Sequence, residues 1–418
     1  MTCRPIRIQP KSRLGSGLVL PLFLRPLLLL FAIAISSWAA PPNDVNGRTF
    51  TELARAAAAA RDAERLQEAT ALYAKALAIR PRWMEGWWSL GTLEYDQDHY
   101  VKAANAFSKL LALNPRNGTA HAMLGLCQFE LQQDDVALNH LLAAEKFGVV
   151  KNEQLRKVSL FHLGLLQLRA RHFSSSKETL DQLAKDGLRT NELVEALGHA
   201  ALMIRPQQAP PEGTDGYRIM NRAGDAEFAL AVKDFDRARA IYAGLIAEFP
   251  QYPNLHLAYG RLLLELHESD DAVAQFQEEL RRDPQNIHCL LEIAAVRYQV
   301  DSKNALPYAE RAVKLAPHIP FAHYLLGALR LDVDDAAGAI PELEIARRGL
   351  PRSAQVYFAL GNAYARTGQK LEAAKARAEF ARLNALDSRQ STDAVHREQS
   401  LGLNPKELQS IDSERPPR

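Results

Sequence analysis

The sequence predicts an all-α protein built from repeated pairs of helices, and three observations support this. Alanine and leucine dominate the composition and β-branched runs are few, which favours helices over strands. Apolar residues recur at spacings of three and four, the period of an amphipathic helix with one buried face. Small residues and prolines return in the same setting about every 34 residues, so the same structural unit is expected many times.

Each unit is marked by an alanine or a glycine in its first helix. Six of the nine intervals between successive markers are 34 residues, and the markers are Ala57, Gly91, Gly125, Gly164, Gly198, Ala226, Gly260, Ala294, Gly327 and Gly361. A second small residue follows most markers after twelve residues, and a proline often follows after twenty-four. We expect the small residues where the two helices cross, because only short side chains let the backbones approach closely. The proline should end the second helix, because it cannot continue the hydrogen-bond ladder.

Polar turns separate the two predicted helices of a unit. DQDH, QQDD, ESDD and DVDD stand at the same phase in four units. Asp332, Asp334 and Asp335 could suggest a calcium loop, but the glycine and the closing glutamate of such a loop are missing. Because acids recur at this phase in other units, they are predicted to form turns and to cap the helices that follow.

The segment WWSLGTLEY…YVKAANAF…LNP, between residues 87 and 115, resembles the tetratricopeptide repeat. It has that family's Trp, Leu-Gly, Tyr, Ala, aromatic and Pro positions, and it departs at Glu94, where the family usually has an aromatic residue. YFALGNAYARTGQKLEAA at 357–374 and YLLGALRLDVDDAAGAIPELEIA at 324–346 are similar. The resemblance covers roughly residues 48–385. It implies a right-handed α-α superhelix of about ten helix-turn-helix units.

One interval, from Gly198 to Ala226, is only 28 residues long, so one unit is expected to lose its second helix to a loop. We therefore predict an N-terminal array at 48–204, a loop or linker at 205–216 and a C-terminal array at 217–385. Whether the linker is a hinge or only a kink stays open. Residues 386–418 are polar and are predicted to be a largely disordered tail.

The first 39 residues have the order of a secretory signal peptide. Basic residues come first, then an apolar run at 27–35, then Ser37 and Ala39 on either side of Trp38. We expect cleavage after Ala39 and hence an exported protein, periplasmic or secreted. The nine-residue apolar run is much shorter than the ~20 residues of a membrane span. An uncleaved membrane anchor over residues 18–35 is the alternative.

The charge balance argues against nucleic acid as a partner. Cleavage would remove five basic residues and no acidic ones, so the net charge would change from +2 to −3. Phosphate binding needs a basic stripe instead. Of the remaining cysteines, Cys127 and Cys289 lie in apolar helical contexts and are expected to be buried free thiols. A disulfide between them in an oxidising compartment is the alternative.

No catalytic signature is present in the sequence: HExxH, GxSxG, CxxC and a glycine-rich phosphate loop are all missing. His318 and His323 have no cysteine or carboxylate cluster at ligand spacing beside them, so no metal site is expected. We therefore predict a protein without catalytic residues, cofactor or metal. An enzymatic site at the 205–216 loop is the least favoured alternative.

The resemblance implies that ligands lie on a concave face formed by the first helix of each unit. Positions predicted to face inward are unusually apolar and aromatic, and an exposed apolar stripe usually marks a partner site. Alternatively, curvature of the superhelix buries these side chains against neighbouring units. The predicted binding residues are Trp88, Tyr95, Phe129, Phe161, Leu165, Tyr298, Tyr324, Phe358, Arg261 and Asn362.

Two details sharpen the expected ligand. Trp87 occupies the packing position of its repeat, whereas Trp88, about 100° further round the helix, is predicted to face inward. The family's clamp for an acidic C-terminus needs several Lys, Arg and Asn residues, whereas Arg261 and Asn362 are isolated. The sequence therefore predicts a scaffold that binds an apolar or aromatic-containing protein segment. A subunit of an envelope assembly or polysaccharide-export complex is the alternative.

Overall fold

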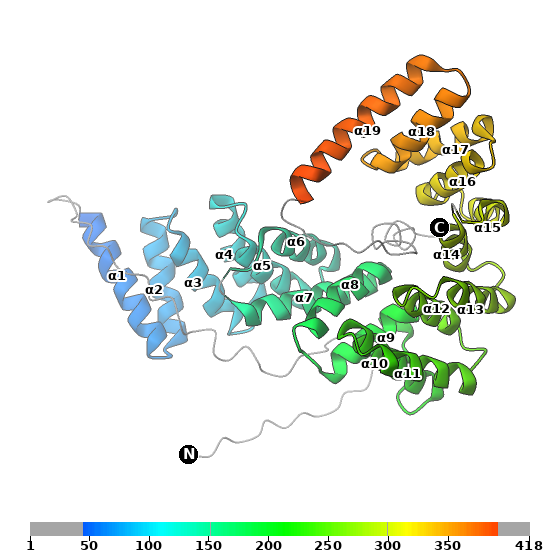
Figure 1. Cartoon of the computed structure of the whole chain (residues 1–418). Helices are drawn as coiled ribbons and strands as arrows, with labels where there is room; N and C mark the ends of the chain where they lie inside the picture. Colours follow the sequence, from blue (N-terminus) through cyan, green and yellow to red (C-terminus); the bar gives the residue numbers. More distant parts are fainter. Residues whose placement is uncertain (1–44, 151, 299, 392–418) are drawn as a thin grey trace. The chain divides into compact units, whose positions relative to one another are not determined.

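The computed structural model describes residues 45–150, 152–298 and 300–391, and these ranges are helical throughout, with no strand among them (Figure 1). Nineteen α-helices and one short 3-10 helix follow one another along the described chain. They form two compact units, unit 1 up to Leu163 and unit 2 from Gly164. The predicted signal peptide and most of the predicted tail lie outside the described residues. The predicted division into arrays at 205–216 stays a prediction.

Unit 1 is a solenoid of helical hairpins, each a pair of antiparallel helices. Its helices are α1 (Val45–Asp62), α2 (Leu66–Ile79), α3 (Met84–Tyr95), α4 (Tyr100–Leu113), α5 (Gly118–Glu130), α6 (Asp134–Phe147) and the first part of α7 (Glu153–Arg169).

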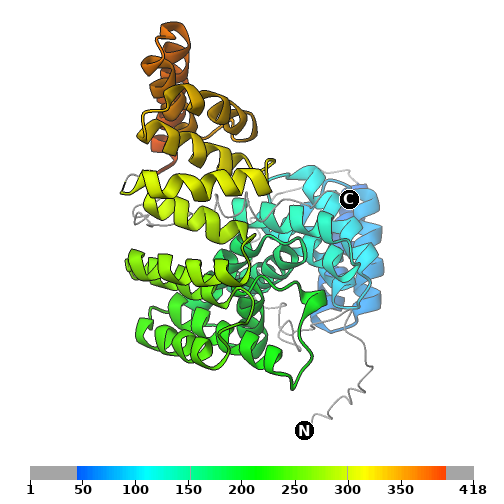
Figure 2. The same ribbon diagram turned by 90° about the vertical axis from the view of Figure 1, so that its right-hand side faces the viewer.

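Unit 2 continues the same construction from the second part of α7, and its hairpins follow one another side by side from green to orange (Figure 2). Its further helices are α8 (Phe173–Lys185), α9 (Asn191–Ala201), η1 (Pro206–Gln208), α10 (Asp215–Ala231), α11 (Phe235–Glu248), α12 (Leu255–Glu265), α13 (Ser269–Arg282), α14 (Ile287–Arg297), α15 (Ser302–Leu315), α16 (Pro320–Asp332), α17 (Ala336–Gly349), α18 (Ala354–Arg366) and α19 (Lys370–Ser391). Helix α19 thus continues into the stretch predicted as the tail.

Small residues lie where the helices of a hairpin cross, as the repeat predicts. A Cβ atom added to Gly91 would lie 2.7 Å from the Phe107 ring, and one added to Gly260 would lie 2.4 Å from the Phe276 ring. The second small position is also enclosed, since Ala103 is fully buried. In these two hairpins a phenylalanine ring therefore fills the space that a side chain at the glycine position would occupy.

Prolines follow most of the second helices, α6 and α8 excepted, and several of their carbonyl groups take part in the junction to the next hairpin. Pro81, for example, lies two residues beyond α2, and its carbonyl accepts a hydrogen bond from Trp87 Nε1 at 2.8 Å. The same bond, from the side chain six residues after the proline, recurs at His121, His256, His323 and Tyr357. The junction after α13 is different, because Leu290 stands at the donor position and cannot donate.

The turns within hairpins depend on a residue with positive φ. Asp98 has φ of 59°; its N–H donates to Tyr95 O at 2.9 Å, and the next N–H donates to Glu94 O at 2.9 Å. This pair of bonds satisfies the carbonyls at the end of α3. The same conformation recurs at Glu64, Gln132, Arg171, Lys233, His267, Asp334 and Gly368.

The predicted capping role of the acidic turns is wrong for most of them. Of the three acids in DVDD, only Asp335 caps its helix, accepting from the Gly338 N–H at 2.9 Å. Asp334 adopts positive φ, and Asp332 accepts from Ser302 Oγ at 2.8 Å. His99, Gln133 and Glu268 stand at the cap positions of the other three turns and make no capping bond through their side chains. The acidic residues that do not cap a helix therefore form the turn, as Asp334 does, or bond to the neighbouring hairpin, as Asp332 does.

Helix α9 lacks a second helix of its own, as the short interval predicts, and packs directly on α10. A Cβ atom on Gly198 would lie 2.1 Å from Met220 O, and one on Gly224 would lie 1.9 Å from Val194 O. The two backbones are therefore in contact. Helix α10 packs against both α9 and α11.

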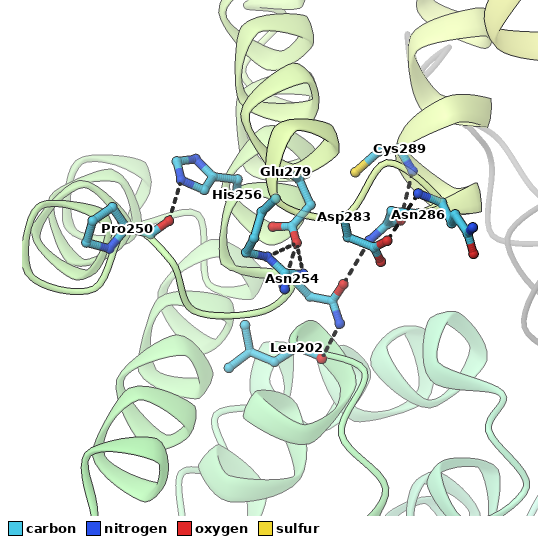
Figure 3. A network of polar contacts seen from close by, with 10 residues as sticks. Leu202, Pro250, Asn254, His256, Glu279, Asp283, Asn286 and Cys289 are labelled. Atoms are coloured by element: carbon cyan, nitrogen blue, oxygen red, sulfur yellow. Dashed lines mark hydrogen bonds and ion pairs between the residues drawn. The ribbon is translucent and has the colours of Figure 1, made fainter.

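Asn254 ties the end of α9 to the hairpins that follow it (Figure 3). Its Nδ2 donates to Leu202 O at 3.0 Å, and its N–H donates to Glu279 Oε1 at 3.0 Å. Asn286 Nδ2 donates to Asn254 Oδ1 at 3.1 Å, while Asn286 Oδ1 accepts from the Cys289 N–H. This network fixes the loop between α13 and α14 with respect to α9 and α12.

Candidate protein-binding face

The structure sorts the predicted binding residues by burial. Phe129, Phe161 and Leu165 are 8%, 3% and 8% exposed, so for these three the alternative of burial against neighbouring helices holds. Phe358 is 54% exposed. The half-buried ones are Trp88, Tyr95, Arg261, Tyr298, Tyr324 and Asn362.

Trp88 and Tyr95 lie on α3 in unit 1. The Trp88 ring lies edge-on to the buried Phe107 ring at 5.6 Å, and the Tyr95 ring lies 5.4 Å from Tyr100. Burial raises the pKa of Tyr95, and the charge of Glu130 adds to this effect. Both side chains thus present one side to solvent and use the other for packing.

Phe129 belongs to a fully packed segment of α5. Every residue from Ala122 to Phe129 is buried, and the Phe129 ring meets His162 of α7 at 4.6 Å and nearly at right angles. An apolar helix that is covered all round is a core helix rather than one wall of an open groove. The centre of unit 1 therefore offers little of its predicted inner face to a ligand.

Arg261 forms an ion pair with a buried carboxylate, Glu292. Its Nε donates to Glu292 Oε1 at 2.9 Å, and Glu292 is 1% exposed. Removing either partner would leave a buried charge uncompensated. Arg261 is therefore mainly committed to holding α12 against α14.

An ionic cluster around the buried Glu227 in unit 2 was not predicted from the sequence. Lys177 Nζ lies 2.8 Å from Asp181 Oδ2 and 3.0 Å from Glu227 Oε2, and the Tyr242 hydroxyl donates to Glu227. Burial raises the pKa of Asp181, and burial next to Glu227 raises that of Tyr242. These groups come from α8, α10 and α11, so no spacing along the chain could reveal them. The cluster links three helices, and its charges are paired with one another.

Tyr298 lies at the end of α14, Tyr324 on α16 and Phe358 on α18. Tyr324 packs beside Phe321 at 5.8 Å and contacts the cores on both sides of α16. Phe358 contacts Phe380 of α19 at 5.4 Å and leaves most of its ring open. Among the predicted binding residues, Phe358 is therefore the most accessible.

The described residues also bear on three other features: a metal site, a disulfide and a membrane span. No group of three or more His, Cys, Asp or Glu side chains in this part of the chain could hold a metal ion. Cys127 and Cys289 are both buried free thiols, which confirms that expectation. No helix among the described ranges is long and apolar enough to cross a membrane.

Two segments match sequence profiles of the tetratricopeptide repeat, residues 89–148 in unit 1 and 229–292 in unit 2. The chain is 25% identical over 297 residues to the CTR9 homolog of Arabidopsis thaliana, and 23% identical over 314 residues to superkiller protein 3 of Schizosaccharomyces pombe. These alignments cover 70% and 72% of the chain but only 25% and 20% of the two relatives. The chain thus spans about a quarter or less of their length.

Several solved structures align with part or most of the chain. MamA aligns with a TM-score of 0.37 and 19% identity, covering 39% of this chain and 96% of MamA. Yeast Tom70 aligns with a TM-score of 0.32 and 12% identity, covering 88% of this chain and 95% of Tom70. A tetratricopeptide repeat protein from Parabacteroides merdae aligns with a TM-score of 0.31 and 16% identity, covering 68% of this chain and 99% of that protein.

Proposed function

We propose that this chain of tetratricopeptide-type repeats is a non-catalytic scaffold that binds protein segments through aromatic side chains of its first helices. The observation that carries the proposal is the partial exposure of Trp88 and Tyr95 in unit 1 and of Phe358 in unit 2. Large aromatic side chains gain much free energy when a partner covers them, and they are frequent among interface hot spots. The partner is a protein segment with apolar or aromatic side chains.

Export is part of the proposal and rests on the signal-like N-terminus. A partner would then be another exported or envelope protein. A subunit of an envelope assembly or polysaccharide-export complex is the alternative, and it differs in that the chain would stay attached to a membrane complex after a salt wash.

The test replaces the three accessible aromatic residues. We expect W88A/Y95A/F358A to lose partners that the unmodified mature chain captures from an envelope extract, as measured by mass spectrometry. The matched control is V101A/F235A, because Val101 and Phe235 are also exposed but lie on second helices. Circular dichroism should show equal helicity in the unmodified chain, the triple variant and the control variant. The single variant F358A is tested as well, because W88A also removes a packing contact with Phe107. Undiminished capture by the triple variant would contradict the proposed face.

A further inference from the structure

A hollow of about 260 Å³ lies between the second helices α13 and α15 of unit 2. Leu280 forms its apolar part, and polar side chains form the rest: Gln277, Arg281, Tyr308 and Arg311. It is separate from the predicted binding residues, all of which lie on first helices or, for Tyr298, at the end of one. The hollow is therefore a second candidate surface of different chemistry.

Arg311 is held in place by the junction after α13, where the residue six positions after the proline cannot donate a hydrogen bond. Because Leu290 cannot donate to the Pro284 carbonyl, that oxygen is available, and Arg311 Nη2 donates to it at 2.8 Å. The loop that carries Pro284 is itself fixed by the network of Asn254, Glu279 and Asn286 (Figure 3). A guanidinium has five N–H donors, so one bond to a carbonyl orients Arg311 and leaves donors for a ligand.

Tyr308 and Arg281 add donors on the other sides of the hollow. Tyr308 Oη accepts from Gln277 Nε2 at 3.3 Å, so the hydroxyl proton is free to donate elsewhere. Arg281 pairs with Glu278, but its side chain is 71% exposed, and an exposed pair of this kind contributes little free energy. An incoming carboxylate can therefore compete for Arg281.

Exposed basic side chains extend from the hollow along the ends of the next second helices. Lys314 lies at the end of α15, Arg348 lies near the end of α17, and Arg352 lies in the loop after it. None of the three has an ion-pair partner among the described side chains. Two partly exposed acids also lie on α13 and α15, Glu278 and Glu310. Basic residues near helix C-termini complement the helix dipole, which explains Lys314 and Arg348 but not Arg352.

We propose that the hollow and this basic strip bind an acidic segment of a protein partner, with one carboxylate seated between Arg281, Tyr308 and Arg311. Guanidinium and hydroxyl donors suit a carboxylate, and charge-assisted hydrogen bonds of this kind are the stronger ones. The inference takes from the proposed function only that the partner is a protein, and it concerns a different surface.

The experiment measures the fluorescence anisotropy of a labelled peptide in which glutamate and glycine alternate. The peptide is titrated with the complete mature chain, residues 40–418. The same peptide with glutamine in place of glutamate is the ligand control. We expect the acidic peptide alone to bind, and to bind more weakly as salt rises. R311Q should raise its Kd about tenfold, and Y308F should raise it about threefold. K102Q removes an exposed lysine of unit 1 and should leave the Kd within about twofold.

Three outcomes would overturn the inference: equal binding of the glutamine peptide, equal weakening by K102Q, or no effect of R311Q. If an anionic oligonucleotide or phosphatidylglycerol vesicles bound and the peptide did not, the proposal that the partner is a protein would be overturned. W88A/Y95A/F358A should still bind the acidic peptide, so failure of the aromatic face and failure of the basic hollow are distinguishable.

Discussion

Gly260 shows how a single missing side chain sets the distance between two helices. A Cβ atom there would lie 2.4 Å from the ring of Phe276, which is fully buried and has no room to move. Gly244, in the middle of α11, is different, because the nearest atom to its added Cβ would be the flexible end of Arg222 at 3.3 Å. The same residue type thus has opposite roles at these two places.

We predict that Gly260→Ala lowers the free energy of unfolding by about 2 kcal/mol, because the added methyl overpacks the core. Gly244→Ala should raise it by about 0.5–1 kcal/mol, because alanine favours the helix and nothing rigid opposes it. Urea unfolding followed by circular dichroism measures both changes. Effects of the same sign in the two variants would refute the opposite roles assigned to Gly260 and Gly244.

At the scale of elements, histidines join the two helices of several hairpins. His121 Nδ1 of α5 lies 2.8 Å from His140 Nδ1 of α6, and in two other hairpins the equivalent partners are Gln275 and Glu342. Burial lowers the pKa of His140, and the nearby charge of His121 lowers it further. Two imidazoles at this distance can share one proton between them but not accommodate a second.

This geometry predicts a loss of stability in unit 1 as the pH falls. A lowered folded-state pKa means that the unfolded chain binds the proton first, so the stability contributed by neutral His140 is present above about pH 6.5 and decreases below it. His140→Gln, which copies Gln275, should remove this part of the pH dependence. Hydrogen exchange of α5 and α6 between pH 7 and 5 measures it.

The control is His267→Gln, at an exposed turn in unit 2, which should leave the exchange of α5 and α6 unchanged. An unchanged pH dependence in His140→Gln would show that other groups cause the loss. Glu130 cannot cause this loss, because burial raises its pKa and a raised carboxyl pKa makes the folded state more stable as the pH falls.

At the scale of the whole molecule, the proposed destination of the chain depends on residues 1–39, outside the described ranges. An exported chain with both cysteines buried as free thiols meets an oxidising compartment without exposing a reactive thiol. Burial raises the pKa of Cys127 to about 12, so its reactive thiolate is scarce at neutral pH. Buried thiols therefore fit an exported protein, and cleavage of the leader is the direct test of export.

We predict that the chain purified from a periplasmic or culture fraction begins at Ala40, as intact-mass spectrometry would show. Replacing Ala39 by leucine should block cleavage, because the position before the cut requires a small residue. Replacing Ala56, which lies in α1 beyond the leader, by leucine should leave the cleavage site unchanged. A full-length mass in the membrane fraction of the unmodified protein would instead support the anchor over residues 18–35.

The sequence by itself determined the hairpins, their number to within one, and the single missing second helix. The reason is that these features depend on residues close together in the chain: a small residue opposite a large one sixteen positions later, a turn, and a proline. Each signal acts inside one unit and is repeated in many, so a local departure such as Leu290 does not hide the pattern.

Only the tertiary structure decided which inner side chains remain accessible. Tyr324 and Phe358 stand at the same repeat position, yet Tyr324 packs against α18, whereas no further described hairpin follows to cover Phe358. The ionic cluster at Glu227 and the hollow at Arg311 likewise assemble from different helices. Burial and clustering depend on what the neighbouring hairpins contribute, and a repeat pattern describes each hairpin alone.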